Sequence, residues 1–253
     1  MLTRRLVVCL DVDEGRVRKG VAFRGLRDVG DPPTLARRYE AAGADEIVFL
    51  DVGATVASRE TLLDTVRRTA ATLSIPLTVG GGVRSADDAA RTLRAGADKI
   101  AVNSAAVARP ALIAECAARF GAQCVVASID ARRVGDDWRV VTHGGRRDTP
   151  LDARAWALEC ERLGAGEILL TSIDRDGARD GYDLALTREV AASVSIPIVA
   201  SGGAGTPAHV AAVLLDTGAD AALVAGILHD GVTSVGEIKR ALRRAGLAVR
   251  MTA

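Results

Sequence analysis

The sequence predicts an α/β protein, a (βα)8 TIM barrel built from two duplicated half-barrels. Three observations support this fold class. Short runs of β-branched and other apolar residues alternate with amphipathic stretches of helical period. The alternation extends over the whole chain and yields eight strand–helix pairs. The second half of the chain also repeats the first. Residues 1–253 are therefore expected to form a single barrel domain.

The elements follow one another without a low-complexity linker or a break in composition. We expect strands near residues 5–10, 46–51, 76–80, 98–103, 123–129, 167–172, 197–201 and 220–225. The amphipathic stretches predict helices at about residues 33–43, 58–73, 85–95, 108–120, 151–164, 184–194, 206–217 and 233–246. The apolar runs have strand length and each leads into a helix, which is the order of a parallel sheet.

The duplication is visible in two pairs of segments. "SIPLTVGGG" at residues 74–82 returns as "SIPIVASGG" at 195–203, and "GADEIVFL" at 43–50 returns as "GAGEILLT" at 164–171. Both pairs are offset by the same 121 residues. Two half-chains of four strand–helix units each close naturally into a barrel. A doubly wound open sheet is the alternative, but it does not predict a repeat of the whole chain.

The composition excludes several classes of partner. Lys and Arg number 33 against 32 Asp and Glu, so the net charge of +1 gives no electrostatic footprint for nucleic acid or an anionic membrane. Any bound anion must be held by a local site. No apolar run approaches transmembrane length, and the run at the N-terminus is too short for a signal peptide.

The four cysteines show no CxxC or CxxH spacing. We therefore expect thiols in a reducing compartment, which predicts a cytoplasmic protein, and not disulfides or metal ligands. No cluster of His, Cys or acidic residues has metal-ligand spacing, so neither a metal nor another cofactor is expected.

Two acids end equivalent strands of the two halves. In a barrel strand, alternate residues face the interior and the C-terminal end lies at the active-site mouth. The first strand then gives one inward column of Arg5, Val7, Cys9 and Asp11, with Asp11 at the mouth. Its duplicate Asp130 falls on the opposite side. Each alone would fit a turn cap; together they suit general acid and base catalysis, provided that one is protonated and the other ionised.

The opposite ends of four columns carry charges, and these alternate in sign around the barrel. They are Arg5, Glu46, Lys99 and Glu167. The pattern predicts a ring of ion pairs at the barrel floor. Stability is the usual role of that face, but a charged ring beneath small apolar residues is also typical of a channel gate.

Two glycine-rich turns lead from strands into helices. "TVGGGVRS" offers Gly81 and Gly82, and "ASGGAGTP" offers Gly202 and Gly203. Glycine lets the backbone approach an oxyanion, and the following helix N-terminus supplies free N–H groups. The adjoining strand ends add Asn103, Ser104, Ala225 and Gly226. Strands seven and eight form the usual phosphate site of this fold, so the repeat predicts a second one opposite. The substrate would be a long molecule with a phosphate at each end.

Five motifs together are highly specific. "CLDVDEGRVRKG", "TVGGGVRS", "DKIAVNSA", "SIDRDGARDGYD" and "ASGGAG" occur in this order and resemble the cyclase subunits of imidazole glycerol phosphate synthases over essentially the whole chain. The sister family is the phosphoribosylformimino ribotide isomerases, which share the repeat and both phosphate sites. The "CLDV" segment and Gly181, Tyr182 and Asp183 favour the cyclase. A non-catalytic phosphosugar-binding subunit is a third hypothesis, but it predicts that the mouth carboxylates are lost.

The resemblance implies a lyase of histidine biosynthesis. Ammonia from a partner glutaminase would enter at the barrel floor through the gate of Arg5, Glu46, Lys99 and Glu167, with Asp98 at the partner interface. Phosphoribulosyl-formimino-aminoimidazole carboxamide ribotide would become imidazole glycerol phosphate and aminoimidazole carboxamide ribotide. Asp11 and Asp130 would be the acid and base, in either order.

The resemblance also implies substrate contacts around the mouth. Lys19 would close over the substrate, and further contacts would come from Asn103, Thr171, Asp176, Gly177 and Ser201. The chain departs from the family pattern at Gly53 and Gly226, where many members carry threonine and serine. At Gly226 the backbone amide would have to serve the phosphate alone.

Overall fold

Parallel strands form a closed ring at the centre of the molecule. A computed structural model describes residues 3–21, 24–51, 53 and 56–251. Within these residues, eight parallel strands run in the order β10-β11-β12-β1-β4-β5-β6-β7, and β7 pairs with β10 to close the ring. They are β1 (Arg5–Asp13), β4 (Glu46–Asp51), β5 (Leu77–Gly80), β6 (Lys99–Val102), β7 (Val125–Val134), β10 (Glu167–Ser172), β11 (Ile198–Ser201) and β12 (Ala221–Val224). The predicted (βα)8 barrel is confirmed.

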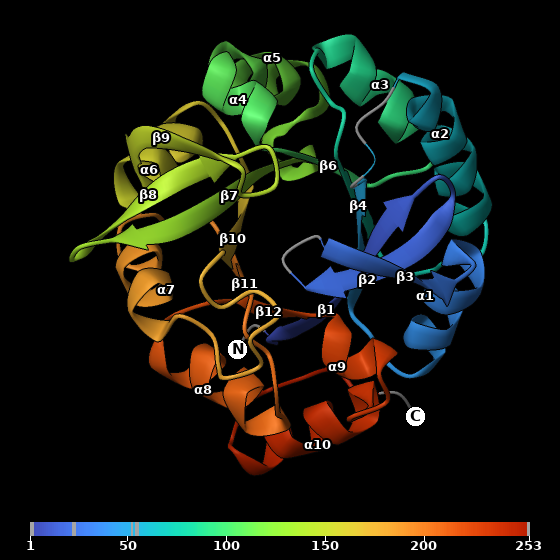
Figure 1. Ribbon diagram of the computed structural model, residues 1–253, viewed down its shortest axis with the longest axis vertical. Coiled ribbons are helices and arrows are strands. Elements are labelled where there is room, and N and C mark those ends of the chain that lie inside the picture. The colour runs from blue at the N-terminus through green and yellow to red at the C-terminus, as the bar shows by residue number, and fades with distance from the viewer. Residues whose placement is uncertain (1–2, 22–23, 52, 54–55, 252–253) are drawn as a thin grey trace.

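Helices surround the strands, as the view down the barrel shows (Figure 1). They are α1 (Pro32–Ala41), α2 (Val56–Ala70), α3 (Ala86–Arg94), α4 (Ser104–Ala108), α5 (Ala111–Phe120), α6 (Ala153–Arg162), α7 (Leu184–Ala191), α8 (Pro207–Asp216), α9 (Gly226–His229) and α10 (Val235–Arg244), with a 3-10 turn η1 (Ala122–Cys124). None of the helices in the described ranges is long and apolar enough to cross a membrane.

The helix starts agree with the cap residues in the sequence. Ser85 accepts the backbone N–H of Asp88 at the start of α3, and Thr206 accepts that of His209 at the start of α8. The expected helix over residues 108–120 is wrong at its beginning. It is divided into α4 and α5, because Pro110 disfavours the helical conformation at Arg109, which is extended with φ −145° and ψ 85°.

Two antiparallel hairpins extend the barrel at the C-terminal ends of its strands. β2 (Arg16–Val21) and β3 (Arg24–Gly30) follow β1, and β8 (Asp137–Thr142) and β9 (Arg147–Asp152) follow β7. Figure 1 shows them on opposite sides of the ring. The eight strands expected from the sequence do not include these four. Their charged residues hide the strand alternation.

The barrel interior is filled by one apolar layer between floor and mouth. Its buried members are Val7, Cys9, Val48, Ala101, Val126, Leu169, Val199, Ala221 and Leu223. Val7, Cys9, Val48, Ala101 and Leu169 belong to the predicted columns that begin with the four floor charges. The outward faces of the strands pack against the helices in two larger clusters. The columns therefore place charged groups below this layer and polar groups above it.

Candidate active site

The two mouth carboxylates lie on opposite sides of the barrel. Asp11 is in β1 and Asp130 is in β7, four places away in the ring of eight described strands. Asp11 is in register with Leu50 of β4, and Asp130 with Thr171 of β10. Both side chains are partly exposed, above the apolar layer. The duplicated strands thus present two acids to one opening.

Asp130 has surroundings that favour its protonated form. Burial, followed by the negative charge of Asp176, raises the pKa of Asp130 to about 7, although a hydrogen bond from Asn103 opposes the shift. The Asn103 amide donates to Asp130 Oδ2 at 2.9 Å. The buried Asn103 Oδ1 has no hydrogen-bond partner within the described structure. Asp130 can therefore give or take a proton near neutral pH, and a neighbouring amide oxygen is available to a ligand N–H group.

Asp11 has a different neighbour. The Cys9 thiol donates to Asp11 Oδ1 at 3.5 Å from two residues earlier in the same inward column. The Cys9 side chain is buried in the apolar layer, so the contact approaches the carboxylate from below. The equivalent acids of the two half-barrels are therefore supported in different ways.

The predicted glycine turns approach the backbone of a neighbouring strand end. A Cβ added to Gly81, where φ is +96°, would lie 2.6 Å from the Asp51 Cβ at the end of β4. A Cβ at Gly202, where φ is +90°, would lie 2.6 Å from the Ser172 carbonyl oxygen at the end of β10. The two half-barrels thus use the same packing, and this packing alone requires glycine at both positions.

Gly82 and Gly203 complete the two turns, each with a positive φ. A Cβ at Gly203 would lie 2.1 Å from the Gly181 carbonyl oxygen. Any side chain at this position would therefore require the backbone at Gly181 to shift. The turns precede the capped starts of α3 and α8. Free N–H groups in this setting attract anions.

The other predicted contacts lie around the same opening. Thr171 and Ser201 are in register at the ends of β10 and β11. Ser104 begins α4, and its hydroxyl accepts the backbone N–H of His143 at 2.9 Å. The loop after β10 carries Asp176 and Gly177, and the residues after β12 are Ala225 and Gly226.

The backbone of Lys19 belongs to a strand and not to a loop. Lys19 lies in β2 opposite Arg27 of β3. Its side chain lies outside the described part of the structure. The turn between β1 and β2 places Glu14 and Gly15 at φ 48° and 74°, as in the tight turns that favour hairpins.

The loop over residues 173–183 is tied to three elements. The Tyr182 hydroxyl donates to the Leu223 carbonyl of β12 at 2.8 Å from a buried position. Asp183 caps α7 and accepts the indole N–H of Trp138 at 2.9 Å. Asp174 accepts the backbone N–H of Arg133 at 2.7 Å. The Tyr182–Asp183 pair, used above to distinguish the cyclase from the isomerase, therefore anchors the loop that carries Asp176.

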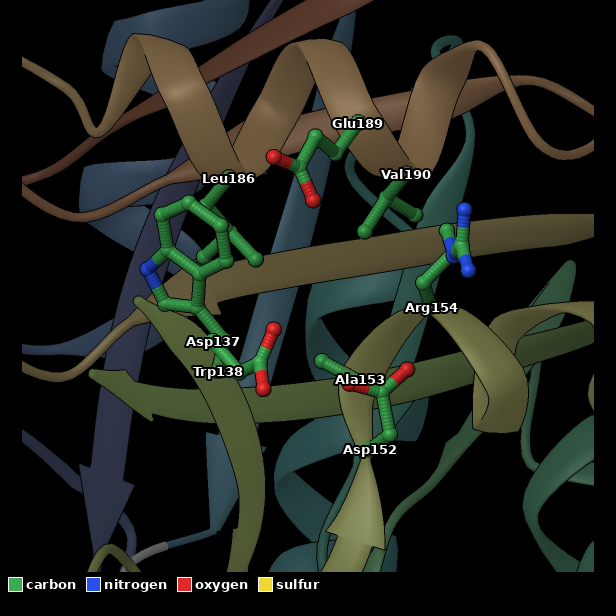
Figure 2. Close-up of a pocket in the computed structure, with 8 residues that line it drawn as sticks. All are labelled: Asp137, Trp138, Asp152, Ala153, Arg154, Leu186, Glu189 and Val190. Atoms are coloured by element: carbon green, nitrogen blue, oxygen red, sulfur yellow. The ribbon is translucent and has the colours of Figure 1, made fainter. Parts of the chain in front are cut away.

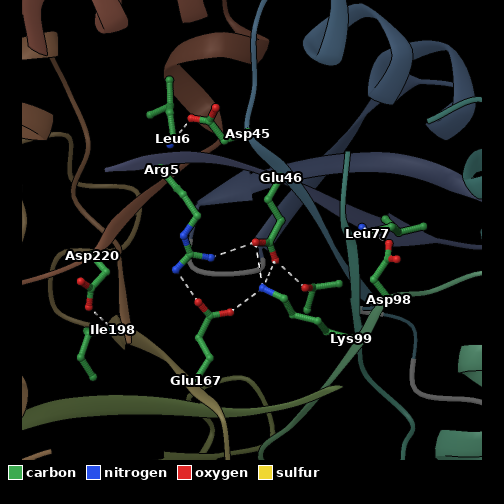
Figure 3. Close-up of polar contacts among 11 residues, drawn as sticks. Arg5, Leu6, Asp45, Glu46, Leu77, Asp98, Lys99, Glu167, Ile198 and Asp220 are labelled. Carbon is green, nitrogen blue, oxygen red and sulfur yellow. Dashed lines mark hydrogen bonds and ion pairs between the residues drawn. The ribbon is translucent and has the colours of Figure 1, made fainter. Parts of the chain in front are cut away.

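The predicted charges at the barrel floor form a closed ring (Figure 3). Arg5 contacts Glu46 at 3.1 Å and Glu167 at 2.5 Å, and Lys99 contacts Glu46 at 3.0 Å and Glu167 at 2.8 Å. Both glutamates are buried. Although burial opposes it, the charges of the glutamates raise the pKa of Arg5. The alternation of sign around the floor is confirmed.

Thr78 also contacts this ring, although it was not among the residues predicted from the sequence. Its hydroxyl donates to Glu46 Oε1 at 2.6 Å, and its side chain is fully buried. Thr78 is the floor-end polar residue of β5, so the column pattern that revealed Lys99 contains the same signal. A threonine in an apolar strand is less conspicuous than a charge.

Asp98 has a structural contact at the floor. Its carboxylate accepts the Leu77 N–H at 2.8 Å, just as Asp45 accepts the Leu6 N–H at 2.8 Å. Asp220 repeats the contact with Ile198 at 3.1 Å. These aspartates precede β6, β4 and β12 and accept N–H groups at the starts of the neighbouring strands (Figure 3). An interface role for Asp98 would be additional to this one.

The model of a family described as histidine biosynthesis proteins matches residues 5–234. This chain belongs to that family. Three relatives are each named imidazole glycerol phosphate synthase subunit HisF. Those of Myxococcus xanthus and Metallosphaera sedula are 70% and 56% identical to it, each over 99% of this chain and 99% and 100% of the relative. That of Bacillus cereus strain Q1 is 55% identical over 99% of this chain and its own full length.

In this histidine biosynthesis protein a cavity of about 270 Å³ also lies outside the barrel. The β8–β9 hairpin, the start of α6 and one side of α7 enclose it, and Trp138, Leu186 and Val190 supply its apolar lining (Figure 2). None of the predicted site residues lines it. In the described ranges, no group of three or more His, Cys, Asp or Glu side chains could hold a metal ion.

Proposed function

We propose that this chain is the cyclase subunit of an imidazole glycerol phosphate synthase and acts in histidine biosynthesis. The observation that carries the proposal is the pair of carboxylates, Asp11 and Asp130, set on opposite sides of one mouth with different neighbours. The names of the full-length relatives support the same activity. We also propose a cytoplasmic location, which fits four cysteines of which none forms a disulfide in the described chain.

The substrate proposed is phosphoribulosyl-formimino-aminoimidazole carboxamide ribotide, which has a phosphate at each end. One phosphate would bind beside Gly81 and Gly82, and the other beside Gly202 and Gly203. The equivalent positions of the turns in the two half-barrels support this arrangement. The remaining contacts proposed are Lys19, Asn103, Ser104, Thr171, Asp176, Gly177, Ser201, Ala225 and Gly226.

The reaction adds ammonia, cleaves the intermediate and closes the imidazole ring. Over these stages, protons are delivered to departing groups and removed from attacking nitrogens. A pKa of about 7 gives Asp130 a proton to donate at neutral pH, which a carboxyl of ordinary pKa lacks. We propose that Asp130 donates first and that Asp11, across the mouth, accepts. Asn103 Oδ1, which is buried beside Asp130, would accept an N–H of the substrate.

We propose that a glutaminase subunit covers the floor and delivers ammonia through the barrel, so that the assembly is a heterodimer. Arg5, Glu46, Lys99 and Glu167 would form the gate, and Asp98 would lie at the interface. All four gate residues are engaged in ion pairs in this structure. Passage of ammonia therefore requires at least one of these pairs to open.

Asp11→Asn tests the acid–base role. The variant is expected to lose ammonia-dependent turnover by about 10²–10⁴-fold, the usual range for a general acid or base. Substrate affinity should change little, because the phosphates and not the carboxylate anchor the ligand. Turnover is measured with ammonium chloride as donor, and affinity by calorimetry.

Asp148→Asn is the matched control, since it removes an exposed carboxylate from the β9 hairpin, where it pairs with Arg132. It should retain wild-type turnover. An Asp11→Asn protein with near wild-type turnover would contradict the proposed role.

A further inference from the structure

A short stretch of β1 has no paired strand on one side. β12 pairs with β1 only as far as Val8 opposite Val224, and β2 begins to pair with β1 only at Val12. β4 pairs with β1 without a break from Val7 to Val12. Asp11 lies in the gap between β12 and β2, where regular strand pairing is present on the β4 side only.

The side that faces this gap includes the carbonyl of Cys9. Along a parallel strand, successive residues direct their backbone groups to alternate neighbours. The Arg5 N–H binds the Asp220 carbonyl beside β12, and the Leu6 carbonyl accepts the Asp45 N–H beside β4. Cys9, an even number of residues from Arg5, therefore directs its carbonyl towards β12, beyond the last residue of that strand.

His229 supplies the missing partner. His229 Nε2 lies 3.1 Å from the Cys9 carbonyl oxygen, and His229 Nδ1 lies 2.7 Å from the Tyr39 hydroxyl. A carbonyl oxygen only accepts, so Nε2 carries the hydrogen, and in the neutral ring Nδ1 accepts from Tyr39. The two rings are tilted by 50° with centroids 5.6 Å apart. Tyr39 is buried in α1, and its burial raises the pKa of the phenol, which keeps its proton.

The chain of contacts continues to the carboxylate. The Cys9 thiol donates to Asp11 Oδ1 at 3.5 Å. Tyr39 of α1, His229 of α9 and Cys9 of β1 thus form consecutive links that end at Asp11. The outer helices α1 and α9 thus hold β1 where no neighbouring strand pairs with it, just before Asp11.

The other half-barrel does not repeat this arrangement. By the 122-residue offset between "AGADKIAVNS" and "TGADAALVAG", His229 corresponds to Val107 and Ala225 to Asn103. Asp130 receives its hydrogen bond from Asn103, and Val107 has no side-chain donor. The tyrosine–histidine link is specific to the half that contains Asp11.

We propose that His229, held by Tyr39, is a positioning residue for Asp11. By fixing the Cys9 carbonyl in place of a neighbouring strand, His229 sets the position from which the Asp11 carboxylate meets the substrate. This inference rests on the role proposed for Asp11. Small displacements of a reacting group, of about 1 Å, can cost about 10²-fold in rate.

Three single variants and one double variant test the inference in the ammonium-driven assay. His229→Leu removes the donor to Cys9 and should lower kcat by about 10–100-fold with KM changed less than about twofold. His229→Gln restores an N–H at the position of Nε2 and should recover most of kcat. Tyr39→Phe removes only the hydroxyl and should lower kcat by about 3–10-fold. The His229→Leu and Tyr39→Phe double variant should be no slower than His229→Leu alone, because both act through one link.

The outcomes separate this inference from the proposed function. If His229→Leu has the kcat of the wild type, with or without a raised KM, the positioning role is overturned. In that case an inactive Asp11→Asn variant still supports the proposed function. An active Asp11→Asn overturns the function itself. If His229→Leu does not fold, Tyr39→Phe and the ¹⁵N NMR signals of His229 decide the question. A proton on Nε2 is expected, and a proton on Nδ1 alone overturns the inference.

Discussion

Asp130 illustrates how a single residue acquires its chemistry from its surroundings. Although Asp130 is partly exposed at the mouth, the surrounding protein desolvates its carboxyl and Asp176 adds a nearby negative charge. The pKa of about 7 follows from these two causes in that order. The folded protein then binds a proton that the unfolded chain releases at pH values above about 4. Stability should therefore fall as the pH rises from about 4 to about 7, where the folded carboxyl also ionises.

Asp130→Asn removes this dependence. The variant should gain melting temperature over the wild type, and the gain should be larger at pH 8 than at pH 5, because the wild type carries the full cost of a buried charge only above pH 7. Thermal unfolding at the two pH values measures the difference. Asp148→Asn, which changes an exposed carboxylate, serves as the control. A gain for Asp130→Asn that is equal at both pH values would show that the carboxyl does not titrate with a raised pKa.

The alternation of inward and outward residues along each strand correctly predicted which single residues face the barrel interior. Asp11, Asp130 and the four floor charges follow from it, because alternate residues of a strand share one face. The raised pKa of Asp130 could not be predicted in this way, because Asp176 reaches it from the loop of a different strand. The contacts of His229 were also out of reach, since they join α9 to β1 and α1.

At the scale of elements, the glycine turns combine a special backbone conformation with close packing. Gly203 and Gly231 both have positive φ values, +102° and +66°, but only Gly203 faces a nearby backbone atom. Around Gly231 there is open space. A comparison of alanine substitutions at the two positions therefore separates the cost of the backbone conformation from the cost of the steric contact.

Gly203→Ala should destabilise the protein more than Gly231→Ala. The alanine at residue 231 bears only the left-handed backbone penalty of about 1–2 kcal/mol, or roughly 2–8 °C in melting temperature for a chain of this size. At residue 203 the Gly181 carbonyl must also move, so a loss of at least about twice that is expected, together with a raised KM. Equal melting temperatures for the two variants would mean that the turn adapts without cost.

The two hairpins show where the element-level prediction failed. β8 alternates buried and exposed side chains only partly, and charged residues such as Arg16 of β2 and Asp137 of β8 are exposed. The turn at Glu14–Gly15 was not predicted. In the structure its two successive residues have positive φ values, which favour a two-residue hairpin loop. The hairpins extend the strands that carry Asp11 and Asp130, and so they shape the mouth.

At the scale of the whole molecule, the duplication is what allowed closure of the barrel to be predicted. The equal offsets imply that equivalent strands lie half a turn apart, and β1 and β7 do so. The repeat is imperfect at the residue before β10. Gly166 replaces the aspartate that precedes β4, β6 and β12, because a Cβ there would lie 2.3 Å from the Ala122 carbonyl oxygen.

The floor ring links the two halves and should contribute to stability. Lys99→Met leaves the buried Glu46 and Glu167 with one cation fewer, and breaking a buried pair in this way costs about 3–5 kcal/mol. Arg4→Met is the control, because the Arg4–Asp220 pair is more than 30% exposed on both sides and should cost about 0–1 kcal/mol. Urea unfolding compares them, and equal losses would show that the ring is not a stabilising unit.

In the proposed function, the barrel uses ammonia directly and depends on a partner to release it from glutamine. The most direct measurement is turnover of the isolated chain with its bisphosphorylated substrate at a pH above neutral, where more of the ammonium is present as free ammonia. We expect imidazole glycerol phosphate formation with ammonium chloride and none with glutamine. Turnover with glutamine in the absence of a partner would contradict this function, and so would turnover of the formimino precursor without any nitrogen donor, as an isomerase would show.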